Sequence, residues 1–243
     1  MALDIMLTIA VTSVIQSIFG VGVLLFGTPL LLLFGYDFIQ ALTILLPISL
    51  SINAFQIAQH HAQIDTDFYK KILIFTIPFV VLFLFLVTSS SINIGFVIGL
   101  FLLFVALKSY SPEVERAVES MVKYEKAYFV VMGIVHGLTN LGGSLLTAIV
   151  HSKNYEKDVT RVTVAIAYAT FALFQILTLA FAVKTMDIPY AVNGIYLTVG
   201  VLIFVLTDSM LYVNIDNERY SNIFAIFLLA SGVLLILKSL GLL

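Results

Sequence analysis

Long apolar stretches separated by short polar connections run along the whole chain. Eight apolar segments can be drawn, at about residues 3–35, 38–59, 71–88, 92–108, 127–151, 160–183, 188–207 and 221–240. Most of them approach or exceed the roughly 20 residues that a helix needs to cross a bilayer. The pattern therefore predicts an all-α polytopic membrane protein.

Composition supports this class and narrows the chemistry. Hydrophobic residues make up 61% of the chain and charged residues 11%, and the mean hydropathy is +1.11. Soluble domains carry roughly a quarter charged residues. Cysteine is absent, which excludes disulfides and thiolate chemistry, and the net charge of −2 gives no footprint for nucleic acid. We expect the bilayer as a partner, no nucleic acid, no metal and no cofactor, and leave a homo-oligomer open.

The location follows from the same pattern. The first segment has no basic start and carries Asp4 as its only charge, so we expect it to be retained as a membrane segment. The predicted location is the cell (inner) membrane, with multiple passes.

Short matches at a constant offset indicate that the chain contains two related halves. The stretch "QSIFGVGVL" from Gln16 aligns with "HGLTNLGGS" from His136, "FQI" recurs at 55–57 and 174–176, and "LKS" recurs at 107–109 and 237–239. We interpret residues 1–110 as a first membrane repeat, 111–126 as a polar connecting loop and 127–243 as a second membrane repeat. Internal repeats of this kind are typical of secondary transporters, which bind substrate between the repeats.

The distribution of basic residues favours one topology over another. Eight single crossings would place Lys153, Lys157, Arg161 and Arg219 opposite the other basic residues. If the first and fifth segments enter and return to the same side, only Lys184 and Lys238 lie opposite the rest. The positive-inside rule favours this second arrangement. The first segment, at about 1.5 Å per residue, is also too long for one crossing of a core of about 30 Å.

Each of these two segments contains residues that weaken a helix interior. The first contains Gly20, Gly22, Gly27 and Pro29, and the fifth contains Gly137, Gly142 and Gly143. Unwound backbone at membrane depth is tolerated only where protein or water satisfies it, and a helix N-terminus exposed there attracts anions. The alternative is that these small residues let neighbouring helices pack closely. We expect each segment to be broken or re-entrant at its Gly-rich motif.

These motifs resemble those of the sulfite exporter TauE/SafE family of membrane transporters. Its halves open with a pattern like G-x-x-G-x-G-G-G and then a proline. The first half here, "FGVGVLLFGTPLL", keeps Gly20, Gly22 and Pro29 but has Val23 and Leu24 at glycine positions. The second, "GLTNLGGSLLTAIV", keeps Gly137, Gly142 and Gly143, with Asn140 and Ser144 at glycine positions and Ile149 at the proline position. The resemblance implies transport of sulfite, sulfonates or related organosulfur anions.

Few polar side chains lie inside the apolar segments, and they define the candidate site. No Asp, Glu, Lys or Arg occupies the middle of a segment, so His136 is the only ionisable candidate there. We therefore predict a small-anion site built from helix termini, amides and hydroxyls without a permanent positive side chain. The candidate substrate-binding residues are Gln16, Gly20, Gly22, Asn53, Gln56, His136, Asn140, Gly142, Gly143, Ser144 and Gln175.

Three of these candidates carry specific expectations and specific alternatives. Protonated His136 would neutralise the bound anion and couple its movement to a proton, or a neutral His136 would bridge two helices. Gln56 and Gln175 each follow a phenylalanine in the second helix of a half, so both amides could point to a shared axis. Each amide could equally form a bond between helices worth about 1 kcal/mol.

Two other functional classes compete with a secondary transporter. A passive anion channel has the same sequence features, because a sequence does not display alternating access. A membrane-embedded hydrolase would need a nucleophile and a base, for which Ser144 and His136 could form a dyad. No Asp or Glu at the same depth could orient the imidazole, so we expect no enzymatic activity.

Overall fold

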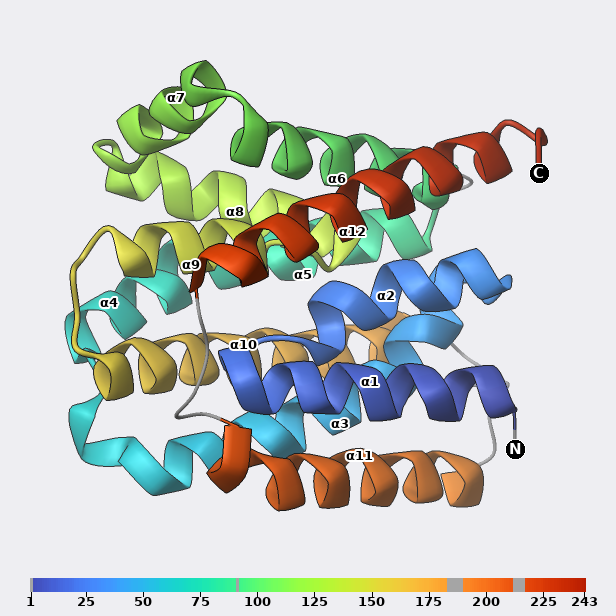
Figure 1. Ribbon diagram of the computed structural model, residues 1–243, viewed down its shortest axis with the longest axis horizontal. Helices are drawn as coiled ribbons and strands as arrows, with labels where there is room; N and C mark the ends of the chain where they lie inside the picture. Colours follow the sequence, from blue (N-terminus) through green and yellow to red (C-terminus); the bar gives the residue numbers. More distant parts are fainter. Residues whose placement is uncertain (1, 91, 183–189, 212–216) are drawn as a thin grey trace.

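The computed structural model describes residues 2–90, 92–182, 190–211 and 217–243, and the described chain is helical without strands (Figure 1). Its first part contains α1 (Leu3–Phe19), α2 (Val23–Phe34), α3 (Phe38–His60), a 3₁₀ turn (His61–Gln63), α4 (Thr66–Lys71), a π-helical turn (Ile72–Thr76), α5 (Ile77–Thr88) and α6 (Ile94–Tyr110). The connection contains α7 (Pro112–Val122). The rest contains α8 (Glu125–Thr139), α9 (Gly143–His151), α10 (Lys157–Ala182), α11 (Tyr190–Leu211) and α12 (Asn217–Ser239).

Within these residues, four helical stretches are long and apolar enough to cross a membrane. They are α3, the continuous run from α4 to α5, α10 and α11, and the bent pair α6–α7 makes a fifth if it counts as one span. Large apolar side chains also face outward around the molecule, among them Leu82, Phe85, Leu206 and Phe181. Such an apolar exterior fits lipid as the solvent. The predicted all-α polytopic membrane fold is confirmed.

Polar residues between the apolar segments start the helices that follow them. The Asp37 side chain accepts a hydrogen bond from the Gln40 N–H at 2.8 Å, and the Gln40 side-chain oxygen accepts one from the Asp37 N–H. The helix α3 therefore begins with a capping box. Asn93 caps α6, and Ser111 caps α7 with Pro112 in its first turn. The stretch expected as a polar loop at 111–126 therefore contains a helix.

The first apolar segment is a helical hairpin whose two ends lie at the same side of the molecule. Tyr36, just after α2, donates its hydroxyl to the Asp4 carboxylate at 2.9 Å, and Asp4 lies in the first turn of α1. Lys238, at the end of α12, donates to the carbonyls of Leu32 and Leu33 and so caps the C-terminus of α2. We call this side of the molecule, where both termini also lie in Figure 1, the Asp4 side.

The fifth apolar segment is a second hairpin that enters from the opposite side. Glu125, at the start of α8, forms ion pairs with Lys153, just after α9, at 2.7 Å and with Lys71 at 2.6 Å. Asp65, before α4, accepts a hydrogen bond from Tyr155 at the same end of the fold. We call this the Lys71 side. The hairpins α1–α2 and α8–α9 thus enter from opposite sides, and the remaining long helices run between the sides (Figure 1).

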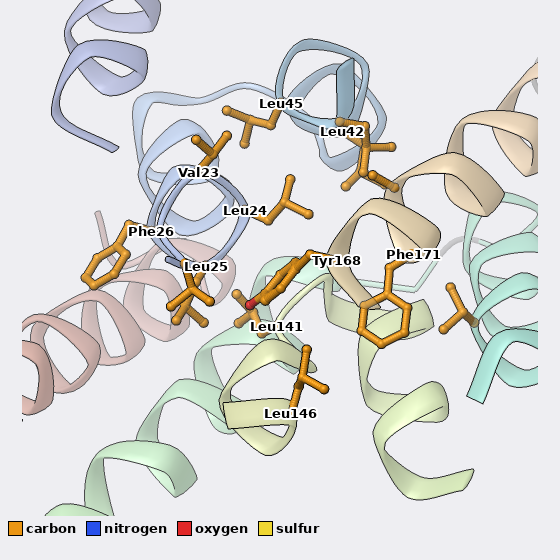
Figure 2. Packing of buried hydrophobic residues seen from close by; sticks show 14 of the residues in the cluster. Val23, Leu24, Leu25, Phe26, Leu42, Leu45, Leu141, Leu146, Tyr168 and Phe171 are labelled. Carbon is orange, nitrogen blue, oxygen red and sulfur yellow. The ribbon is translucent and has the colours of Figure 1, made fainter. Parts of the chain in front are cut away.

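The hairpins pack against one another through an apolar core at the centre of the fold. Val23, Leu24, Leu25 and Phe26 of α2 are all buried in it. Figure 2 shows Leu24 and Leu25 of α2 beside Leu141 and Leu146 of the second hairpin, with Tyr168 of α10 between the groups. This packing places the polar side chains of the candidate site on two sides of an apolar centre.

Candidate functional site at two opposed helix breaks

The first hairpin turns at Gly20, and Gln16 holds the turn together. Gly20 adopts the left-handed conformation, with φ 74°, and its N–H donates to the Gln16 carbonyl at 2.8 Å, which ends α1. The Gln16 side chain donates to the Gly20 carbonyl at 3.2 Å and accepts the Val23 N–H at 2.9 Å. One buried amide therefore satisfies the last carbonyl before the break and the first N–H of α2. The predicted break is confirmed, but Gln16 supports the backbone instead of facing an open site.

The second hairpin turns in the same way at Asn140. Asn140 has φ 62°, in the left-handed region that asparagine tolerates, and its N–H donates to the His136 carbonyl at 2.8 Å. Its Nδ2 donates to Thr28 Oγ1 in α2 at 2.9 Å, whereas its buried Oδ1 has no hydrogen-bond partner among the described residues. The tip of the second hairpin therefore contacts the middle of α2.

Glycines at both tips allow the chain to fold back on its own helix. A Cβ on Gly22 would lie 2.6 Å from Gln16 N, and one on Gly142 would lie 2.5 Å from His136 Cβ. A Cβ on Gly143 would overlap the Tyr168 hydroxyl. Close packing and helix breaking, which the sequence offered as alternatives for these glycines, thus occur together.

A chain of buried amides leads from the first tip to a cation. Gln16 Nε2 donates to Asn53 Oδ1 at 3.2 Å, and Asn53 Nδ2 donates to the Ser49 carbonyl at 2.7 Å. With the Gln56 amide in the orientation that satisfies both of its ends, its nitrogen donates to Asn53 Oδ1 at 3.1 Å. Its oxygen then accepts from Arg161 Nε and Nη2 at 3.1 and 3.2 Å.

Arg161 is a permanent positive side chain buried beside the first cluster, where the sequence led us to expect none. Its side chain is 4% exposed, its Nη2 pairs with Asp208 Oδ1, and its Cγ lies 3.5 Å from the position of a Cβ on Gly20. Arg161 lies at the start of the apolar segment 160–183, and Asp208 directly follows the segment 188–207, so neither was expected at membrane depth. In the structure α10 begins at Lys157 and α11 continues to Leu211, so both residues are helical, and pairing allows their burial.

A second polar cluster lies at the tip of the second hairpin. His136 Nε2 and Gln175 Oε1 are 3.2 Å apart, both residues are fully buried, and the His136 ring packs on Phe171 with centroids 4.5 Å apart. Within the described chain, His136 Nδ1 and Gln175 Nε2 have no hydrogen-bond partner. This cluster is a hydrogen-bonded pair with one unused polar atom on each member.

Gln56 and Gln175 do not meet at a shared axis. Gln56 contacts Arg161 and Gln175 contacts His136, and Arg161 and Gln175 lie about 20 Å apart along α10 at 1.5 Å per residue. Tyr168 lies between them on the same helix, in the apolar centre (Figure 2). The candidate residues therefore form two clusters, one at each hairpin tip, instead of one site.

Ser144 belongs to neither cluster. Its hydroxyl donates to the Leu141 carbonyl at 3.1 Å, while His136 Nε2 faces Gln175. Among the described side chains Ser144 and His136 form no hydrogen bond with each other, so the dyad that a hydrolase would need is not assembled there.

The ion pairs at the Lys71 side stabilise the second hairpin electrostatically. Burial alone would raise the pKa of Glu125, but hydrogen bonds from Lys153 and Lys71 outweigh it and lower the pKa below its ordinary value. Burial also opposes ionisation of Asp65, yet the Phe68 N–H and the Tyr155 hydroxyl leave its pKa lowered. Both carboxylates are therefore ionised near neutral pH and hold the ends of three helices together.

A groove elsewhere on the molecule has different chemistry. It encloses about 550 Å³ between α5 and α10, and its described lining is apolar apart from Thr178. Because Leu82, Phe85 and Phe181 in its lining are also exposed to the surroundings, the groove faces lipid and not an anion path.

Comparison with known proteins identifies the family. The chain matches the family model described as sulfite exporter TauE/SafE over residues 5–235, nearly its whole length. No curated protein and no solved structure matches it. The match agrees with the Gly-rich breaks now seen at Gly20 and Asn140 and with the helical membrane fold. The chain therefore belongs to the sulfite exporter TauE/SafE family of membrane transporters.

Proposed function

We propose that this protein is a secondary transporter that moves sulfite, sulfonates or related small sulfur-containing anions across the cell (inner) membrane. The observation that carries the proposal is the pair of opposed hairpins, linked by the bond between Asn140 and Thr28. Broken helices that enter from opposite sides provide helix termini for a substrate between two halves, an arrangement typical of secondary transporters. The family supplies the class of substrate.

We further propose that the halves, 1–110 and 127–243, arose by duplication and are inverted in the membrane. Two glycines at an offset of 120 support this: Gly22 packs on Gln16 and Gly142 packs on His136, which are themselves related by that offset. The contacts between helices also follow a twofold relation in which α1 corresponds to α8 and α5 corresponds to α11. In the structure α1 packs on α11, and its counterpart α8 packs on α5. The helices α3 and α10, and likewise α6 and α12, pack on their own counterparts.

Transport requires the structure to change, because the polar clusters are closed to solvent. Gln16, Asn53, Gln56, His136 and Gln175 are each at most 2% exposed. We propose that the hairpins rock relative to each other and open one cluster at a time, which is alternating access with the apolar centre as the barrier. In this structure the Val23 N–H at the start of α2 is bonded to Gln16, and the Leu145 N–H in the first turn of α9 is bonded to the Gly142 carbonyl. We propose that these first turns present their N–H groups to the anion once a hairpin opens.

His136 remains our candidate for proton coupling. Its Nδ1 is buried and lacks a hydrogen-bond partner among the described residues, so a second proton added there would put a positive charge beside the second break. Gln175 Oε1, which accepts from a protonated Nε2, would stabilise that cation.

We propose that the Lys71 side faces the cytoplasm. Lys70, Lys108, Lys123, Lys126 and Lys157 stand in its helix ends and connections together with Lys71 and Lys153, whereas Lys238 is at the Asp4 side. Lys184 lies outside the described residues. The excess of basic residues at one side predicts the cytoplasmic orientation.

Transport by the purified protein in proteoliposomes tests the function. Vesicles loaded with sulfite should take up labelled sulfite or sulfoacetate by exchange that saturates with concentration. Unitary currents would instead indicate a channel. Exchange of carboxylates alone, with no exchange of any sulfur anion, would contradict the proposed substrates.

A further inference from the structure

Arg161 lies where both halves of the molecule meet the first helix break. Its neighbours are Gln56 of α3, Gly20 at the hairpin tip and Asp208 of α11, so three other parts of the chain contact this one side chain. The arginine side chain is 4% exposed and that of Asp208 is 9% exposed. A buried cation of this kind is costly in a membrane protein and marks a functional site more often than a structural one.

The position has no counterpart in the other half. Counting back by the offset of the repeat, Arg161 corresponds to Ala41 or Leu42, both of which are buried apolar residues. The equivalent end of the second hairpin contains the pair of His136 and Gln175, neither of which carries a permanent charge. The asymmetry is informative, because a residue needed only to pack the repeat would be expected in both copies.

Gln56 orients the guanidinium of Arg161, and Asp208 forms an ion pair with it. The Gln56 oxygen accepts from Nε and Nη2, and Asp208 Oδ1 accepts from Nη2. Gln56 donates to Asn53 Oδ1, which also accepts from Gln16, and Gln16 closes the break at Gly20. Any change at the hairpin tip therefore reaches the guanidinium through three hydrogen-bonded amides. A carboxylate presents two oxygens to arginine as a small oxyanion does, and the two ligands suit the same guanidinium.

We propose that Arg161 binds the transported anion and that Asp208 occupies its place when no substrate is bound, so that the carboxylate and the anion compete for one guanidinium. This inference rests on the proposed function and adds the residue that recognises the substrate. This competition keeps the buried cation paired at all times. Asp208 neutralises it in the empty carrier, and the anion neutralises it in the loaded carrier. It also limits affinity, which favours release of the anion.

Three variants test the inference. Asp208→Asn removes the competing charge and keeps the size of the side chain. The double variant Arg161→Met with Asp208→Leu removes both charges together, a change that buried ion pairs often tolerate without loss of folding. Asp4→Asn is the matched control, because Asp4 is a carboxylate that contacts Tyr36 and not Arg161. The measurement is the melting temperature of purified protein titrated with sulfite, sulfoacetate or acetate, since a ligand of the native state raises it.

We expect Asp208→Asn to melt below the wild type without ligand and to bind sulfite or sulfoacetate roughly tenfold more tightly. The double variant should lose the rise in melting temperature that the anion causes. Asp4→Asn should show the same anion-dependent rise as the wild type. Unchanged affinity in Asp208→Asn, or an anion shift retained in the double variant, overturns the inference while the proposed function stands. If Asp208→Asn does not fold, the double variant decides. If neither the wild type nor Asp208→Asn responds to any sulfur anion, the proposed substrate class falls together with the inference.

Discussion

Asn140 Nδ2 donates to Thr28 Oγ1 at 2.9 Å, and this bond joins the tip of one hairpin to the middle of the other. The two residues belong to segments that enter the molecule from opposite sides. Asn140 also occupies a left-handed position that ends α8, so one side chain serves both the break and the contact between hairpins. If one hairpin moves against the other, this bond must break, or Thr28 and Asn140 must move together.

A double-mutant cycle measures the bond. Asn140→Gly keeps the left-handed backbone and removes the donor, and Thr28→Val removes the acceptor. Hydrogen bonds between helices in membrane proteins average about 0.6 kcal/mol and reach about 1.7 kcal/mol, so we expect a coupling free energy in this range. The coupling free energy is obtained from the unfolding of the wild type, the two single variants and the double variant in detergent. A coupling indistinguishable from zero would show that the bond does not join the hairpins.

Gln16 should be the most costly amide of the first cluster to remove. Gln16→Leu leaves the Gly20 carbonyl and the Val23 N–H without their buried partner, at about 1–3 kcal/mol for each group. Gln59→Leu is the control, because Gln59 is exposed near the end of α3 and such a change stays within about 0.5 kcal/mol. Equal stabilities of the two variants, compared by denaturant unfolding, would contradict the role of Gln16 in closing the break.

The ion pairs of Glu125 should make stability depend on pH in one direction. Its pKa is lowered in the folded state from the ordinary 4.5, so its contribution is present above that value and disappears as the pH falls through the folded-state pKa. Glu125→Gln should therefore melt below the wild type at neutral pH, and the difference should shrink on acidification. Melting curves of both proteins across this range provide the measurement. A difference that grows as the pH falls would have the wrong sign.

His136→Gln tests the coupling role by placing at position 136 the residue found at its counterpart, Gln16. The variant should fold, because an amide can still bond to Gln175, and its transport should lose pH dependence. The measurement is the rate of sulfite uptake into proteoliposomes at several pH values. Unchanged pH dependence would reject His136 as the proton carrier and leave it as a neutral bridge between α8 and α10.

The helix breaks could be predicted from the sequence because their cause is local. Glycine weakens a helix interior, and the first segment of about 33 residues exceeds one crossing, so breaks were predicted at the Gly-rich motifs of both segments. Asn140 was not named as the left-handed residue of the second break. The helix α7 was not predicted, because the high polarity of 111–126 favoured a loop, although Ser111 followed by Pro112 is a helix start signal. Local rules thus accounted for most of the secondary structure.

The composition of the site could not be predicted in the same way. Arg161 stands four residues inside α10, where a charge at the edge of an apolar segment normally points to water, and only the distant Asp208 and Gln56 make its burial tolerable. Likewise, Gln16 reads as a free amide in the sequence, whereas the structure commits it to the backbone of its own hairpin. Both outcomes depend on contacts between segments that no periodicity encodes.

Two re-entrant hairpins enter the fold from opposite sides, and sided cysteine labelling tests this arrangement most directly. The chain has no cysteine, so single substitutions need no prior removal. Ala2→Cys and Asp37→Cys flank the first hairpin, and Tyr124→Cys and Ser152→Cys flank the second. With an impermeant maleimide, positions 2 and 37 should react from one side of the membrane and positions 124 and 152 from the other. Labelling of 2 and 37 from opposite sides, or of 124 and 152 from opposite sides, would show single crossings and contradict the account.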